Sequence, residues 1–143
     1  MAYTQIGINS EGCGLPPTRL LFYRDRRGNV PVRDWPARLR ARQRRAYAKC
    51  LVRLRQLSAW GHELRRPAVD YVGDGVFELR IRQGRVNYRI MYFFHGSHTA
   101  VLAEALTKEG RIPVTAVARA LQRKNAFKAA PESHAHPGEV DLG

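Results

Sequence analysis

Residues 76–94 decide the fold, and they read Val-Phe-Glu-Leu-Arg-Ile-Arg-Gln-Gly-Arg-Val-Asn-Tyr-Arg-Ile-Met-Tyr-Phe-Phe. On both sides of a turn at Gln83–Gly84, apolar residues occupy every second position. Side chains alternate between the two faces of a strand, so this period of two predicts an antiparallel hairpin with one apolar and one charged face. Each strand carries arginine, whose planar fork of donors suits phosphate oxygens. The stretch therefore predicts a sheet that carries a site for a nucleic-acid backbone.

The charge of the chain is its most unusual bulk property. The 143 residues include 25 Lys+Arg against 12 Asp+Glu, which gives a formal net charge of +13. Residues 19–127 hold 24 of the basic residues and 8 of the acidic ones, so this part of the chain alone carries +16. Such an excess indicates a polyanionic partner or an acidic protein partner.

The composition is that of a globular domain, with 44% hydrophobic and 26% charged residues, which excludes a disordered chain. We expect a loose N-terminal leader at residues 1–18, one domain at residues 19–127 and a mobile C-terminal tail at residues 128–143. No apolar stretch approaches the ~20 residues that span a bilayer, and the N-terminus lacks the apolar core of a signal peptide. We therefore expect a cytoplasmic protein without a membrane partner.

A helical period follows a predicted first strand at residues 19–24. Residues 38–60 have apolar side chains at helical spacing, with Cys50 on the apolar side. The opposite side carries a basic stripe, which has two interpretations: a solvated helix face, or a docking surface for RNA or for an acidic partner segment. The stripe consists of Arg42, Arg45, Lys49 and Arg53.

A further strand at residues 99–106 and a second amphipathic helix at residues 114–127 complete the pattern. The order of elements predicts an α+β fold. It is a small twisted antiparallel sheet, with a helix or helix pair after the first strand and a C-terminal helix.

Five segments make the chain resemble a known family. They are Gly61-His-Glu-Leu-Arg-Arg-Pro67, Gly75-Val-Phe-Glu-Leu-Arg-Ile81, Tyr88-Arg-Ile-Met-Tyr-Phe-Phe-His-Gly96, Leu106-Thr-Lys-Glu-Gly-Arg-Ile-Pro113 and Ala120–Phe127. In order and spacing they resemble the RelE/ParE superfamily of type II toxins, and within it the HigB-type, phage-derived group. The resemblance covers about residues 19–134, and it implies the same α+β fold.

The resemblance also implies a function and partners. It implies a ribosome-dependent mRNA interferase, an endoribonuclease that cuts mRNA on the ribosome and so inhibits translation. A cognate antitoxin, usually of helix-turn-helix type, neutralises such a toxin. Many members have Phe-x-Lys-Lys-[Ser/Thr] before the proline, whereas this chain has Ala105-Leu-Thr-Lys-Glu109. Of the lysine pair Lys108 is kept, and Arg111 adds a nearby positive charge.

Cleavage of RNA by its own 2′-OH needs a proton acceptor, a stabiliser for the charge on the phosphorane and a proton for the 5′-oxygen. Arg89, Arg80 and Lys108 are the candidate charge stabilisers, with Arg111 as support. Glu78 is the candidate base, although a carboxylate between arginines also fits a plain ion pair. Additional candidate RNA contacts are Arg82, Arg111, the basic stripe, and Tyr92 if its ring is not a core residue.

The sequence predicts no cofactor and no metal site, because the pairs His95/His98 and His134/His136 lack carboxylate or cysteine companions at ligand spacing. Two other functions stay open. One is a ParE-like inhibitor of DNA gyrase, which has no RNA chemistry. The other is a catalytically silent module that binds nucleic acid or protein.

Overall fold

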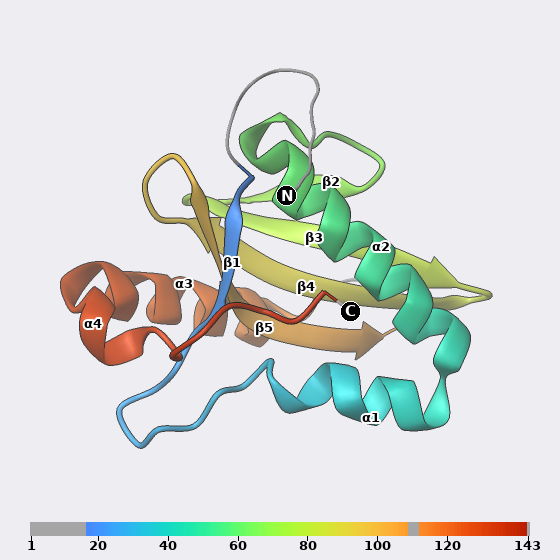
Figure 1. Ribbon diagram of the computed structural model, residues 1–143, viewed down its shortest axis with the longest axis horizontal. Coiled ribbons are helices and arrows are strands. Elements are labelled where there is room, and N and C mark those ends of the chain that lie inside the picture. The colour runs from blue at the N-terminus through green and yellow to red at the C-terminus, as the bar shows by residue number, and fades with distance from the viewer. Residues whose placement is uncertain (1–16, 109–111, 143) are drawn as a thin grey trace.

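The structure is a computed structural model that describes residues 17–108 and 112–142 (Figure 1). Five strands form one sheet in the order β1-β5-β4-β3-β2. The strands are β1 (Arg19–Phe22), β2 (Val69–Gly73), β3 (Val76–Gln83), β4 (Val86–Phe94) and β5 (Thr99–Lys108). The helices are α1 (Asp34–Arg42), α2 (Arg44–Trp60), the short 3-10 helix η1 (Gly61–Glu63), α3 (Val114–Ala129) and α4 (Pro131–His134).

The hairpin predicted from residues 76–94 is confirmed as β3 and β4. Gln83 pairs with Val86, so the turn is Gly84–Arg85, one residue later than expected. Gly84 has a φ of 63°, in the left-handed region that two-residue hairpin loops use. Leu79 and Ile90 face each other on the apolar side and are fully buried. The period of two therefore gives the predicted pair of faces.

The α+β expectation is confirmed, but the sheet is mixed rather than antiparallel. β1 pairs in parallel with β5, from Arg19 opposite Thr99 to Phe22 opposite Leu102. The long connection through α1 and α2 permits this orientation, since a parallel pair needs a crossover rather than a hairpin. β2 was not predicted, because its five residues lie between Pro67 and the turn-forming glycines Gly73 and Gly75.

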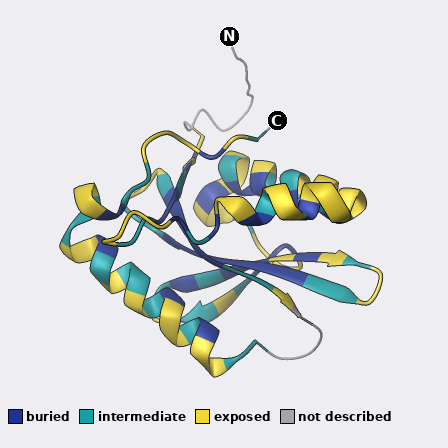
Figure 2. Ribbon diagram, turned by 90° about the horizontal axis from the view of Figure 1, so that it is seen from below, coloured by how far each residue is buried: buried dark blue, intermediate teal, exposed yellow. Residues whose placement is uncertain are grey.

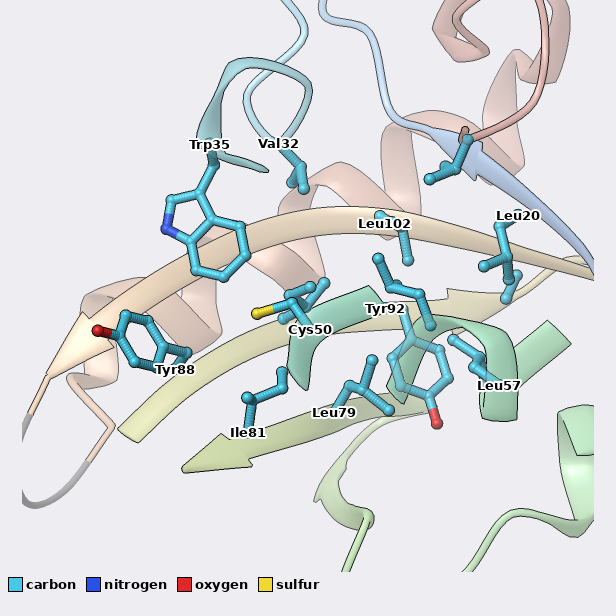
Figure 3. Close-up of a cluster of buried hydrophobic side chains, with 14 of the residues drawn as sticks. Leu20, Val32, Trp35, Cys50, Leu57, Leu79, Ile81, Tyr88, Tyr92 and Leu102 are labelled. Carbon is cyan, nitrogen blue, oxygen red and sulfur yellow. The ribbon is translucent and has the colours of Figure 1, made fainter. Parts of the chain in front are cut away.

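Helices cover both faces of the sheet (Figure 2). α2 packs on the face that carries Leu79, Ile81 and Tyr88, and Trp35 of α1 contacts Tyr88 edge to face at 6.2 Å. This is the main core, and several of its side chains are drawn in Figure 3. Cys50 lies in it with 2% exposure, as predicted, and burial raises the pKa of its thiol to about 12.

The expected helix at residues 38–60 is a helix pair with a break at Gln43 (φ −137°, ψ 73°). Each of the two helices buries its own set of side chains. The buried residues are Trp35 and Leu39 in α1, and Ala46, Cys50, Leu54 and Leu57 in α2. None of the helices in residues 17–108 and 112–142 is long and apolar enough to cross a membrane.

α3 covers the other face, where Ala116 and Ala120 pack against Val76 and Met91. It is also tied to β5 by charge, because the nearly buried Glu104 accepts a hydrogen bond from Arg119 and forms an ion pair with Arg123 at 3.3 Å. Because this carboxylate is paired and hydrogen-bonded, the free-energy cost of burying its charge is offset. It holds α3 in place over one end of the sheet.

The C-terminal residues, for which the sequence predicts a mobile tail at residues 128–143, make packing contacts with the rest of the domain as far as residue 142. His134 is 5% exposed and stacks on Tyr23 at 5.3 Å. His136 and Val140 donate backbone hydrogen bonds of 2.9 and 2.8 Å to the carbonyls of Phe22 and Leu20 in β1. The segment thus follows the outer edge of β1 and donates hydrogen bonds to backbone carbonyls that an edge strand would otherwise leave without a partner in the sheet. Of the expected leader, residues 1–16 lie outside the described residues.

Candidate functional site

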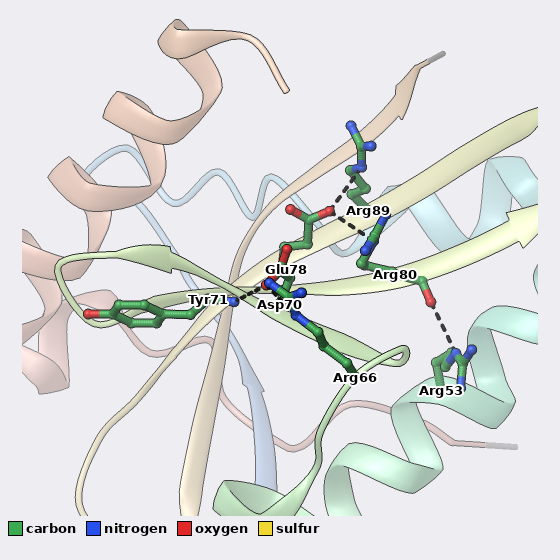
Figure 4. Close-up of polar contacts among 7 residues, drawn as sticks. All are labelled: Arg53, Arg66, Asp70, Tyr71, Glu78, Arg80 and Arg89. Carbon is green, nitrogen blue, oxygen red and sulfur yellow. Dashed lines mark hydrogen bonds and ion pairs between the residues drawn. The ribbon is translucent and has the colours of Figure 1, made fainter. Parts of the chain in front are cut away.

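Three charged side chains of the hairpin form the candidate site (Figure 4). Arg80 of β3 lies directly opposite Arg89 of β4, and Glu78 is two residues before Arg80 on the same face. The Nε atom of Arg89 lies 3.0 Å from Oε1 of Glu78, and that of Arg80 lies 3.5 Å from the same oxygen. One carboxylate oxygen therefore holds two guanidinium groups in place.

The position of this cluster on the sheet leaves part of it accessible. α3 packs on Val76 and Met91, at the far end of the hairpin from its turn. Arg80 and Arg82, nearer the turn, are exposed, while Glu78 and Arg89 have exposures of 5% and 8%. An incoming anion would therefore meet Arg80 first and Arg89 deeper in the site.

Burial controls the electrostatics of Glu78. It raises the pKa of this carboxyl, and the positive charges of Arg89 and Arg80 oppose the rise. Asp70 of β2, which lies opposite Glu78, adds to it. The pKa of Asp70 itself is lowered, chiefly by its hydrogen bond with Arg66, whose Nη2 atom is 2.7 Å away. Glu78 thus takes up a proton more readily than an ordinary glutamate.

Two further residues were predicted for the site: Lys108, which is the last residue of β5, and Arg111, which follows it in the sequence. The backbone of Lys108 pairs with Asn87 in β4, two residues before Arg89. The register therefore places the Lys108 backbone on the strand next to the one that carries Arg89. Arg111 lies outside the described residues.

Tyr92 is a correction to the predicted RNA contacts. Its side chain is 1% exposed and lies in the main core, on the opposite face from Arg89. Burial also raises the pKa of its phenol. The period of two allows a core position, and the core interpretation is the one that holds, because the ring has no free face for a base.

Arg82 is exposed and lies two residues from Arg80 on the same strand. Its Nε atom donates to the carbonyl of Gly84 at 3.0 Å, so the side chain bends back over the hairpin turn. It extends the positive charge of the site toward the turn, where the sequence placed it.

The break at Gln43 divides the basic stripe between two helices. Arg42 ends α1, and the exposed Arg45 lies in the first turn of α2 after the break. The Nζ atom of Lys49 and the Nε atom of Arg53 donate to the carbonyls of Arg82 and Arg80, at 3.2 and 3.0 Å. β2 pairs with β3 only as far as Leu79, so these two side chains cover the edge of β3 beyond it.

This edge contact gives a stability prediction. Replacing Arg53 by methionine keeps much of the aliphatic stem but removes the donor to the Arg80 carbonyl, so we expect the free energy of unfolding to fall by about 1 kcal/mol. Urea denaturation measures the change. Arg45→Met, at an exposed position on the same helix, serves as control with an expected effect within about 0.5 kcal/mol. Equal effects of the two substitutions would contradict an edge-covering role.

Asp70 and Arg66 are neighbours of the site that the sequence did not reveal. Asp70 acts on Glu78 because β2 pairs beside β3, Arg66 binds Asp70, and β2 was not predicted. The weak signal for them is the alternation in Val69-Asp-Tyr-Val72. Among the residues that the structure describes, no three His, Cys, Asp or Glu side chains gather in a group that could hold a metal ion.

Comparison with known proteins identifies the family of the chain. The pattern of the family described as "Phage derived protein Gp49-like (DUF891)" matches residues 37–125, more than half of the chain. The matched region contains Glu78, Arg80, Arg89 and Lys108. Among curated proteins, none matches the chain significantly. The chain therefore belongs to the phage-derived Gp49-like family, a family of RelE/HigB-like toxins.

Proposed function

We propose that the protein is the HigB-type toxin of a type II toxin–antitoxin system and acts as a ribosome-dependent mRNA interferase. The observation that carries the proposal is the cluster of Glu78, Arg80 and Arg89, partly open to solvent, in a chain of a toxin family. Its partners are then mRNA on the ribosome and a cognate antitoxin, of helix-turn-helix type in the proposal.

The proposed reaction is attack of the 2′-oxygen of a nucleotide on its own 3′-phosphate. Glu78 accepts the proton of the 2′-OH as the new O–P bond forms. Arg89 and Arg80 donate hydrogen bonds to the non-bridging oxygens, where charge develops in the phosphorane. The P–O5′ bond then breaks, and the 5′-oxygen takes up a proton from water. The products are a 2′,3′-cyclic phosphate and a 5′-hydroxyl.

In this proposal the site has no general acid, and this explains why cleavage depends on the ribosome. The described cluster offers one carboxylate as a general base. Its two guanidinium groups donate hydrogen bonds, but they do not give up a proton and so cannot serve as the general acid. Catalysis then rests on positioning the attacking oxygen in line with the leaving oxygen. The ribosome supplies that geometry by holding the mRNA, and free RNA in solution does not have it.

The raised pKa of Glu78 predicts a pH profile. A base must be ionised, so the single-turnover rate should fall as pH drops through that pKa, which lies above the usual value of about 4.3. Glu78→Gln should abolish this acid limb and lower the rate by about 10²–10⁴. Asp70→Asn should move the limb to lower pH, because Asp70 raises the pKa of Glu78. An unchanged limb in Glu78→Gln would exclude Glu78 as the base.

A reconstituted assay tests the function. The purified protein is added to mRNA-programmed ribosomes, to the same mRNA alone, and to DNA gyrase with relaxed plasmid and ATP. We expect cleavage on ribosomes, intact free mRNA and normal supercoiling. Inhibition of gyrase with intact mRNA would instead support a ParE-like inhibitor. No effect in any of the three reactions would leave a silent binding module.

A further inference from the structure

Arg80 lies at the point where the support along the outer edge of β3 changes. Its backbone N–H donates a hydrogen bond of 2.8 Å to the carbonyl of Ala68, just before β2. The N–H of Ala68 is not available to the carbonyl of Arg80, because it donates to the carbonyl of Arg65 at 3.2 Å in a turn. The preceding Pro67 has no N–H. The Arg80 carbonyl therefore receives no backbone donor from Pro67 or Ala68.

Arg53 supplies that donor from α2 (Figure 4). Its Nε atom donates to the Arg80 carbonyl at 3.0 Å, and its Nη1 atom donates to Oε1 of Gln56, also at 3.0 Å. Because the guanidinium is a planar group with fixed donor directions, two hydrogen bonds restrict its orientation. The helix is thereby tied to the backbone of one residue of the candidate site.

The side chain of Arg80 depends on its backbone position more than that of Arg89 does. Its ion pair with Glu78 spans 3.5 Å and 43% of the side chain is exposed, whereas the pair between Arg89 and Glu78 spans 3.0 Å and is nearly buried. An ion pair that is open to solvent holds a side chain weakly. The strand that carries Arg80 therefore largely sets where its guanidinium lies.

We propose that Arg53 is a positioning residue, which fixes the backbone at Arg80 so that the Arg80 guanidinium meets the reacting phosphate. The inference rests on the proposed function and extends it to a side chain of α2, which packs on the opposite face of the sheet from Glu78. Misplacement of a catalytic group by ~1 Å can cost about 10²-fold in rate. Since β4 still pairs with Arg80, the loss of the Arg53 bond alone should cost less, about tenfold.

Single-turnover cleavage of mRNA on programmed ribosomes tests the proposal. With saturating protein, Arg53→Met should lower the rate constant about tenfold. Arg53→Lys keeps a donor that can reach a strand carbonyl, as Lys49 does at 3.2 Å, and should recover most of the rate. A wild-type rate in folded Arg53→Met would overturn the proposal.

Arg55→Met is the matched control. Arg55 is on the same helix and also donates to a backbone carbonyl, that of Leu142, at 2.6 and 3.0 Å. Its replacement removes the same charge and the same kind of bond, so cleavage should proceed at nearly the wild-type rate. An equal loss of rate in both variants would mean that lost stability or charge, rather than the position of Arg80, slows cleavage, and would overturn the proposal.

A double-mutant cycle shows whether Arg53 acts through Arg80. In protein that already carries Arg80→Ala, Arg53→Met should cause no further loss of rate, although it should still lower the stability to urea. A merely structural role would lower stability in both backgrounds without this coupling in the rates. A full tenfold loss in the absence of the Arg80 guanidinium would contradict the proposal.

A binding experiment separates failure of this inference from failure of the proposed function. The probe is a short RNA oligonucleotide with 2′-O-methyl groups, which has no attacking hydroxyl and so cannot be cleaved. By fluorescence anisotropy, Arg53→Met should bind it about threefold more weakly than Arg55→Met does, and Arg80→Ala should abolish this difference. If the wild type does not cleave mRNA, the proposed function fails, but this comparison still decides the role of Arg53. Equal affinities of the two variants, or no binding by the wild type, would overturn that role.

Discussion

Replacing Arg89 by alanine is expected to lower the rate of ribosome-dependent mRNA cleavage by about 10²–10³, the cost of removing one donor aimed at a charged transition state. Arg89 is the deepest guanidinium of the site, with 8% exposure, and Glu78 orients it through an ion pair of 3.0 Å. A buried, fixed donor contributes more than an exposed one, because little reorganisation is needed when charge develops. Single-turnover cleavage on programmed ribosomes measures the loss.

Two controls separate chemistry from charge and folding in the Arg89 experiment. Arg85→Ala removes an exposed arginine at the turn of the same hairpin and should leave the rate nearly unchanged. Arg89→Lys keeps the charge but not the planar fork, and should fall between wild type and Arg89→Ala. Circular dichroism and thermal unfolding show whether each variant is folded. Wild-type cleavage by folded Arg89→Ala would remove this residue from the site.

Replacing Phe127 by alanine is expected to lower the free energy of unfolding by about 3–5 kcal/mol. Phe127 is 1% exposed and anchors the end of α3, where its ring meets Phe93 at 5.5 Å and His95 at 5.1 Å, both edge to face. Its loss would leave a cavity and remove these aromatic contacts. Chemical denaturation at neutral pH measures the change.

Val114→Ala is the matched control for Phe127→Ala, because Val114 is on the same helix and is 83% exposed. Its effect should stay within about 0.5 kcal/mol. A small effect of Phe127→Ala, similar to that of Val114→Ala, would contradict the packing of α3 against β4 and β5.

The hairpin and its charged face could be predicted because they depend on local alternation. Leu79 and Ile81 alternate with Arg80 and Arg82, and no distant part of the chain is needed to see that one set is buried. The same pattern placed Glu78, Arg80 and Arg89 on one face. The distances among them follow from the strand register, which a two-residue turn fixes.

Other features could not be predicted because distant segments create them. The helical period predicts that Lys49 and Arg53 face solvent. They cover the edge of β3 instead, because β2 pairs only with the first half of β3. The composition of the C-terminal segment predicts a polar tail, yet its backbone donates hydrogen bonds to carbonyls at the edge of β1. The break at Gln43 divides the predicted helix into α1 and α2, and the helical period of the sequence does not mark it.

Mapping of mRNA 5′ ends after brief induction is the most direct test of the proposed function. Cells that express the wild-type protein are compared with cells that express Arg89→Ala, each with and without an inhibitor of translation. The proposed function predicts new 5′ ends inside translated codons for the wild type, which disappear in the variant and when translation is blocked. Growth arrest with intact mRNA, or cuts that persist in the variant or without translation, would contradict it.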